Sequence, residues 1–126
     1  MKLFILLSLA LVCFASPLGT FNQLDVSQAN TNPIIKSCLE FGIEHLLEEG
    51  LKEGLIPDSD LTLSRVNSIE SQVSRGVNYR FTVELKNERG AEVTSTFTVH
   101  YALASGEITW TDNYDYQYMA PYTSGN

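Results

Sequence analysis

The chain has 126 residues, 44% of them hydrophobic, and a formal net charge of −7. This length predicts one domain with a hydrophobic core of its own. The acidic balance argues against nucleic acid and anionic lipid as partners, because both repel a negatively charged surface.

The first fifteen residues predict a secretory signal peptide. Lys2 precedes an apolar run that is too short to span a bilayer comfortably, and the run ends with Cys13 and Ala15 at the −3 and −1 positions. Cleavage before Ser16 leaves residues 16–126 as the mature domain, with a charge of about −8 and no membrane segment. We therefore expect a secreted protein, or one in the lumen of the endolysosomal pathway. The alternative is a retained membrane anchor.

Cysteine is scarce in the mature chain. Cys13 leaves with the signal peptide, so only Cys38 remains, and neither an intramolecular disulfide nor a cysteine-based metal site is expected. Cys38 lies among apolar residues in a helical pattern. We interpret it as a buried small hydrophobe rather than a reactive thiol, because the sequence shows no activating partner.

The mature chain begins with a polar arm and one helix. Residues 16–31 lack periodicity and predict an extended arm. Residues 32–50 predict an amphipathic helix, which Asn32 can cap, in which Pro33 suits the first position, and which Gly50 can end. Residues 51–60 form the connection that follows. The helix has one apolar stripe: Ile35, Leu39, Gly42 and Leu46.

The remaining residues predict four strands joined in hairpins. Residues 61–71 have a disturbed alternation, which we interpret as a β-bulge. Residues 77–86 and 91–103 alternate regularly between apolar and polar side chains and flank the turn "NERG". The turn "ASGE" leads to a last strand from Ile108 to Tyr116. An antiparallel sheet with one apolar face, covered by one helix, satisfies both patterns and predicts the α+β class.

Catalytic chemistry is hard to find in this sequence. His45 lies on the helix among glutamates, His100 lies on the polar face of a strand, and neither has a partner at metal-ligand spacing. No Gly-rich phosphate loop, nucleophile elbow or triad spacing is recognisable. We expect a protein that is not an enzyme and that uses no metal and no cofactor.

One motif points to a function. The stretch Gln72-Val73-Ser74-Arg75-Gly76, followed by the alternating strand from Val77, resembles the Q-x-V-x-G motif of the cystatin superfamily. Members of this superfamily inhibit papain-like cysteine proteases. The order of trunk, helix, motif and antiparallel sheet is also similar, so the resemblance covers nearly the whole mature chain. The lack of disulfides and the stretch "ITWTDNY" look more like the stefin branch, and the signal peptide looks like the secreted branches.

The resemblance implies a fold, a mechanism and a partner. The implied fold is one helix packed across a four- to five-stranded antiparallel sheet. The implied mechanism is reversible, tight binding, in which a trunk and two hairpin tips wedge into the active-site cleft without being cleaved. The implied partners are cathepsin-type, papain-like proteases, bound by a monomer. The implied protease-binding residues are Leu18 and Gly19 in the trunk, Gln72, Val73, Ser74, Arg75 and Gly76 in the first tip, and Leu103 and Ala104 in the second.

Departures from the family pattern keep a second interpretation open. Ser74 stands where the family prefers valine, and Arg75 replaces a small residue. The second tip, residues 103–106, lacks the Pro-Trp or Leu-Pro of the family, while Trp110 lies beyond it and is expected to pack. The alternative function is a non-inhibitory cystatin-fold scaffold or binding module. Residues 57–60 also lack the asparagine that a legumain-binding site of this family would have. The sequence contains no N-x-Ser/Thr acceptor, so we expect no N-glycosylation.

Overall fold

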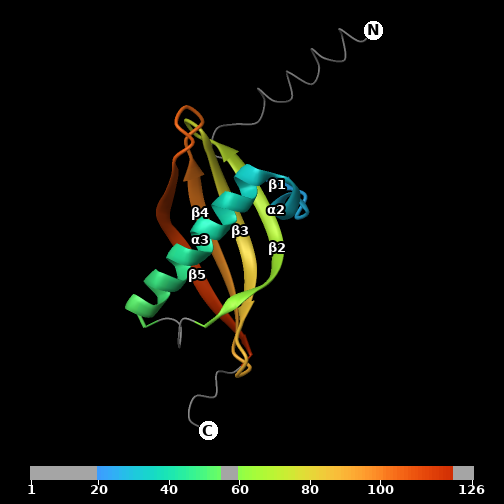
Figure 1. Ribbon diagram of the computed structural model, residues 1–126, viewed down its shortest axis with the longest axis vertical. Helices are drawn as coiled ribbons and strands as arrows, with labels where there is room; N and C mark the ends of the chain where they lie inside the picture. The colour runs from blue at the N-terminus through green and yellow to red at the C-terminus, as the bar shows by residue number, and fades with distance from the viewer. Residues whose placement is uncertain (1–19, 55–59, 121–126) are drawn as a thin grey trace.

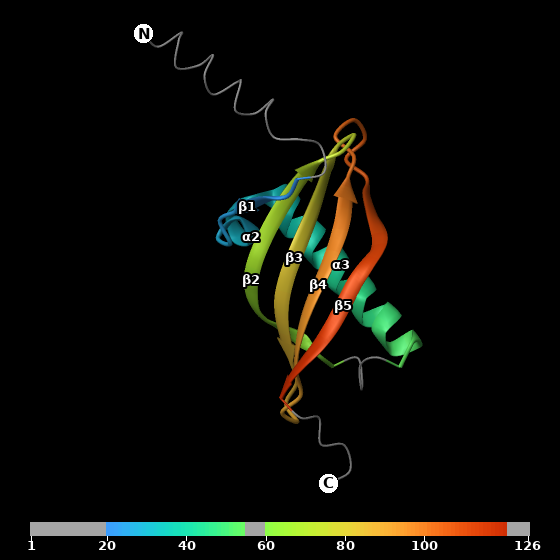
Figure 2. The same cartoon turned by 180° about the vertical axis from the view of Figure 1, so that it is seen from behind.

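The computed structural model describes residues 20–54 and 60–120, which form one helix-covered antiparallel sheet (Figure 1). The five strands lie in the order β1-β2-β3-β4-β5, and α3 crosses one face of the sheet (Figure 2). This confirms the predicted fold class, an α+β cystatin-like arrangement of one main helix on an antiparallel sheet. The elements are β1 (Asn22–Leu24), α2 (Gln28–Thr31), α3 (Pro33–Lys52), β2 (Thr62–Val73), β3 (Val77–Lys86), β4 (Glu92–Tyr101) and β5 (Ile108–Ala120).

The helix α3 begins where the sequence predicts and ends later. The side chain of Asn32 accepts hydrogen bonds from the backbone N–H groups of Ile34 and Ile35, at 3.0 and 3.3 Å, and Pro33 occupies the first turn. The prediction that Gly50 ends the helix is wrong, because Gly50 lies on the buried face and the helix continues to Lys52. The left-handed residue that follows the helix is Gly54, with a φ of 72°.

In the described part of the predicted extended arm, only β1 is a strand. The described part of the arm contains β1, which pairs with β2 from Asn22 opposite Ser71 to Leu24 opposite Ile69. The chain then turns at Asp25, whose carboxylate accepts a hydrogen bond from the N–H of Ser27 at 2.8 Å, and forms the single turn of α2. A three-residue strand is too short to show an alternation, which is why the sequence pattern missed it.

The strand β2 is irregular, as its sequence predicts. Its register against β3 shifts between Leu63 and Arg65 and again between Val66 and Ser68. Such bulges bend a strand and increase its local twist. The strand β1 pairs only with residues 69–71 of β2, so the earlier part of β2 is an edge of the sheet. Both bulges lie in this edge, and their distortion disfavours pairing with a strand of another chain.

The core lies between α3 and the sheet. Phe81 and Phe97 are fully buried at its centre, with ring centroids 5.4 Å apart. Trp110 lies at the edge of the core, 6.1 Å from the Phe97 ring and 5.4 Å from the Tyr114 ring, so the prediction that it packs is confirmed. Cys38 is fully buried, as predicted, and burial raises the pKa of its thiol to about 11.

Two tyrosines on β5 form hydrogen bonds to α3 and to the residue that follows it. The Tyr116 hydroxyl donates to the backbone carbonyl of Leu46, and the Tyr114 hydroxyl donates to the Glu53 carboxylate just past the end of α3. The hydrogen bond to Glu53 raises the pKa of Tyr114 to about 12. In the part of the chain that the structure describes, no helix is long and apolar enough to cross a membrane.

The short distance between α3 and the Phe97 ring leads to a stability prediction. A Cβ atom added at Gly42 would lie only 2.1 Å from the buried Phe97 ring. Alanine normally gains about 1 kcal/mol over glycine in a helix, but overpacking a core costs about 1–3 kcal/mol, and the clash here is severe. Gly42→Ala is therefore expected to lower the free energy of unfolding, measured in urea. Ser37→Ala, on the exposed face of α3, is the control, and a stabilised Gly42→Ala variant would contradict this packing.

Candidate functional site

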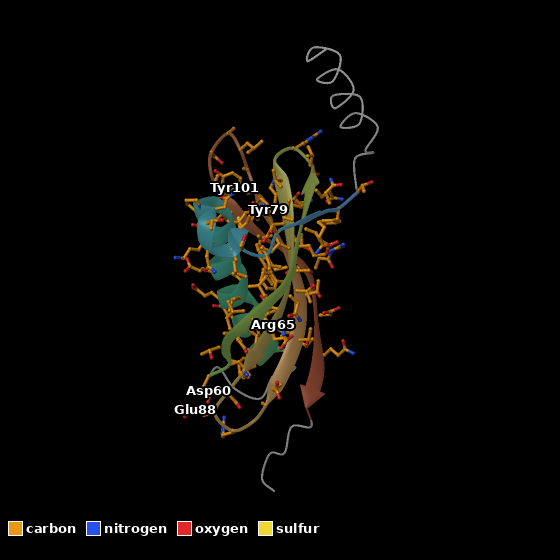
Figure 3. The ribbon with its side chains drawn as sticks, turned by 90° about the vertical axis from the view of Figure 1, so that its right-hand side faces the viewer. Asp60, Arg65, Tyr79, Glu88 and Tyr101 are labelled. Carbon is orange, nitrogen blue, oxygen red and sulfur yellow. The ribbon has the colours of Figure 1, made fainter. Side chains whose placement is uncertain are left out.

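Two hairpin tips lie together at one end of the sheet. Consecutive antiparallel strands reverse the chain at alternate ends, so the β2–β3 and β4–β5 connections share one end and the β3–β4 turn lies at the other (Figure 1). We call the first connection, residues 73–76, tip 1, and the second, residues 102–107, tip 2. Figure 3 shows Tyr79 and Tyr101 near the end that carries the tips, and Asp60 and Glu88 at the opposite end.

Tip 1 comprises the last four residues of the motif that the sequence singled out, Val73 to Gly76. The backbone N–H of Ser74 donates to the carbonyl of Gly76 at 3.1 Å. The chain reverses at Arg75 and Gly76, whose φ angles are both positive, at 50° and 124°. A Cβ atom at position 76 would lie 2.4 Å from the carbonyl oxygen of Tyr101. Glycine is therefore needed at this position both for its backbone conformation and for the close approach of β4.

Tip 2 is closed by its own hydrogen bonds. The N–H of Ala102 donates to the carbonyl of Glu107 at 2.9 Å, and the N–H of Gly106 donates back to the carbonyl of Ala102 at 2.7 Å. Leu103 and Ala104 are exposed at this tip. Leu103 is 67% exposed and Val73 on tip 1 is 64% exposed, compared with 41% for Val26 on the chain before α2. Each tip thus presents one large apolar side chain to solvent.

A row of polar side chains crosses the sheet directly behind tip 1. Asn78 Nδ2 donates to Gln72 Oε1 at 2.7 Å, and Asn78 Oδ1 lies 2.7 Å from His100 Nδ1. The three residues are cross-strand partners on β2, β3 and β4. Gln72, the first residue of the motif, therefore braces the base of tip 1 through its side chain.

The trunk residues Leu18 and Gly19 lie outside the described residues. The chain that follows them joins the sheet beside tip 1, because Asn22 pairs with Ser71. Phe21 immediately precedes Asn22, and the centroid of its ring lies 3.9 Å from the guanidinium carbon of Arg80, a cation–π geometry. Phe21 is therefore held against the sheet only two residues after Gly19.

Arg80 is itself held by a carboxylate. Its Nε and Nη2 atoms each donate to a different oxygen of Glu70 at 2.9 Å, a two-point pairing that fixes the guanidinium plane. The hydrogen bond from Arg80 holds the pKa of Glu70 below its usual range. Glu70, Arg80 and Phe21 thus form a clamp where the chain enters the sheet.

The sequence predicted the tips, including Gln72, but not the other side chains that brace them. Asn78, Glu70, Arg80 and Phe21 were not singled out, and His100 was placed only on a polar strand face. A signal was available, because Gln72 and Asn78 stand three residues on either side of Arg75 and antiparallel pairing brings such positions together.

Among the described residues, no three of histidine, cysteine, aspartate and glutamate lie close enough to hold a metal ion. A shallow polar hollow does occur at the opposite end of the sheet, where Asp60 and Glu88 are labelled in Figure 3. It is lined by Asp60, Thr62, Lys86, Asn87 and Glu88.

The comparisons with known proteins identify no family. A search of protein-family models gives no match to this sequence, and a search of curated proteins gives none either. A functional assignment therefore depends on the residues and the geometry described above.

The clamp leads to a prediction about pH. The lowered pKa of Glu70 means that the pair stabilises the fold fully above the unfolded-state pKa and loses this contribution as the pH falls through the folded-state pKa. Both side chains are partly exposed, so the expected size at pH 7 is at most about 1 kcal/mol. Glu70→Gln should therefore lower the free energy of unfolding at neutral pH, and the difference from wild type should shrink as the pH falls through the folded-state pKa of Glu70. A difference that does not change with pH would contradict the ionic clamp.

Proposed function

We propose that the protein is a reversible, tight-binding inhibitor of papain-like, cathepsin-type cysteine proteases and a member of the cystatin superfamily. The observation that carries the proposal is the common placement of tip 1 and tip 2 at one end of the sheet, where the chain also enters β1 (Figure 1). The proposed activity is not enzymatic, and it requires no metal or cofactor. A secreted or endolysosomal monomer would meet such proteases.

The chemistry of the tips supports binding in a cleft. Val73 and Leu103 leave most of their apolar side-chain area open to solvent among the described residues, at 64% and 67% exposure. Transfer of such side chains into an apolar cleft is favourable, at roughly 25 cal/mol per Å² of apolar surface removed from water. Because both tips are short hairpins closed by backbone hydrogen bonds, little conformational entropy is lost when they bind.

Arg75 gives tip 1 a positive charge on a protein whose net charge is −7. The side chain is exposed, so it is available to a partner. It should favour a protease with an acidic cleft rim, and the preference should fade as the salt concentration rises. Arg75 is therefore the residue of tip 1 that we expect to select among proteases.

The polar character of tip 1 also supports a second candidate function. Ser74 and Arg75 are both exposed at the apex, where an inhibitor of this superfamily would present small or apolar groups. The same scaffold without inhibitory activity would be a binding module for another protein. Inhibition measurements separate the two functions.

The first functional prediction is inhibition itself. Purified residues 16–126 are expected to inhibit papain reversibly and to be recovered uncleaved, because the proposed wedge needs no bond of the inhibitor to break. Titration of active papain, followed by mass spectrometry of the recovered protein, measures both properties. Absence of inhibition at micromolar concentrations across several papain-like enzymes would favour the binding module.

The second functional prediction concerns tip 1. Gly76→Val should abolish most inhibition, because valine resists a φ of 124° and its Cβ would meet the Tyr101 carbonyl. Ser74→Val should strengthen inhibition roughly tenfold by adding apolar area at the apex. The measurement is the inhibition constant of each variant.

A matched control for Gly76→Val lies at the opposite end of the sheet. Gly90, in the β3–β4 turn, also has a positive φ, 90°, but has no atom within 4 Å of an added Cβ. Gly90→Val is therefore expected to strain its own turn and leave inhibition unchanged. Equal losses of inhibition in Gly76→Val and Gly90→Val would mean that tip 1 acts only as a connector.

A further inference from the structure

We propose that His100 is a positioning residue that holds tip 1 and tip 2 in one fixed arrangement, and that Asn78 carries this constraint to Gln72. The inference deepens the proposed function and, for its binding consequence, rests on it. It starts from the row formed by Gln72, Asn78 and His100, which spans three strands on the face of the sheet away from α3.

The hydrogen bonds of the row determine where His100 carries its proton. Asn78 uses its amide nitrogen to donate to Gln72, so its Oδ1 atom is the acceptor that faces His100. The Nδ1 atom of His100 must therefore be the donor. With Nδ1 engaged in this way, the imidazole ring has a defined orientation.

The adjoining Cε1–Nε2 edge of the same ring lies beside Gly76 of tip 1. The Nε2 and Cε1 atoms of His100 lie 3.1 and 3.2 Å from the point that a Cβ of Gly76 would occupy. The carbonyl oxygen of Tyr101 lies 2.4 Å from the same point. Two consecutive residues of β4, His100 and Tyr101, thus border the space that a side chain at position 76 would need.

The same two residues lead directly into tip 2. Ala102 follows Tyr101 and makes both backbone hydrogen bonds that close that tip. A displacement of His100 would therefore move the support of tip 1 and the root of tip 2 together. This is the physical reason to expect that the two tips behave as one rigid unit.

Loss of the imidazole removes both functions of His100. His100→Ala leaves Asn78 Oδ1 without its partner and opens space beside Gly76. His100→Asn is the conservative variant, because the amide nitrogen of asparagine takes the place of Nδ1 and can still donate to Asn78. His100→Gln places its amide nitrogen near the position of Nε2 instead and should not restore that hydrogen bond.

The test uses the free protein first, so that it does not depend on any protease. Amide hydrogen exchange should speed up in His100→Ala by about five- to tenfold, the factor that corresponds to one hydrogen bond, at Ser74 in tip 1 and at Ala102 in tip 2. The amide of Asn87, which donates to Ala91 in the opposite turn, should be unchanged. His100→Asn should restore slower exchange, and His100→Gln should not.

A matched control variant lies on the same strand. Thr96 is on β4 and faces Thr82 across the sheet, with their hydroxyl oxygens 3.1 Å apart, far from both tips along the strand. Thr96→Val removes a cross-strand side-chain hydrogen bond of the same kind and should leave exchange at Ser74 and Ala102 unchanged. Faster tip exchange in Thr96→Val as well would show a general loosening of the sheet and would overturn the proposal.

The second arm measures dissociation of the complex with papain. Where wild type inhibits, His100→Ala should dissociate faster, and His100→Asn should recover part of the loss. Unchanged tip exchange in His100→Ala, or faster exchange with unchanged dissociation, would overturn the positioning role. If wild type does not inhibit, the proposed function fails, while the exchange rates at the tips still decide whether His100 couples them.

Discussion

The close contact between Gly42 and Phe97 sets the distance between the helix and the sheet. Because position 42 has no side chain, α3 can lie directly on the Phe97 ring, at a separation that any Cβ would prevent. At this distance the apolar stripe of α3 reaches Phe81 and the other inward side chains of the central strands. Packing of these apolar side chains builds the core without a disulfide in the described residues, where Cys38 is the one cysteine and is free.

The remaining features follow from that distance. Tyr114 and Tyr116 on β5 reach the last turns of α3 and bond to Glu53 and Leu46, which fixes the helix along the sheet. With the helix fixed, one face of the sheet is covered while both hairpin tips project beyond the N-terminal end of α3 (Figure 1). The tips are then supported mainly by contacts within the sheet, and above all by β4, which passes under tip 1 and leads into tip 2.

Regular patterns in the sequence were enough to predict the main elements. The strict alternation through Phe81 and Phe97 predicts β3, β4 and their buried face, and the cap at Asn32 predicts the start of α3. The end of α3 was missed because a glycine signals a helix end only when it reaches the left-handed conformation, and Gly50 instead packs inside the helix. The bulge in β5, where Asp112 has a φ of 63°, and the strand β1 leave no local pattern.

The candidate site was predictable in its position but not in its support. A glycine in a hairpin motif can be recognised from the sequence, whereas the reason that Gly76 cannot carry a side chain is the Tyr101 carbonyl, which is distant along the chain. Likewise, the row through Asn78 and His100 depends on the register of two strand pairs, which is a property of the folded sheet. Asn78 and His100 stand 22 residues apart in the chain, so a pattern that reads neighbouring residues alone cannot find their contact.

The central claim is that the two tips form one binding surface for a papain-like protease. The most direct measurement is a footprint by amide hydrogen exchange of residues 16–126 alone and bound to papain. The account predicts new protection in residues 73–76 and 102–107 together, with no change in the β3–β4 turn at residues 87–90. Protection confined to the opposite turn, or to the face of the sheet away from α3, would contradict it.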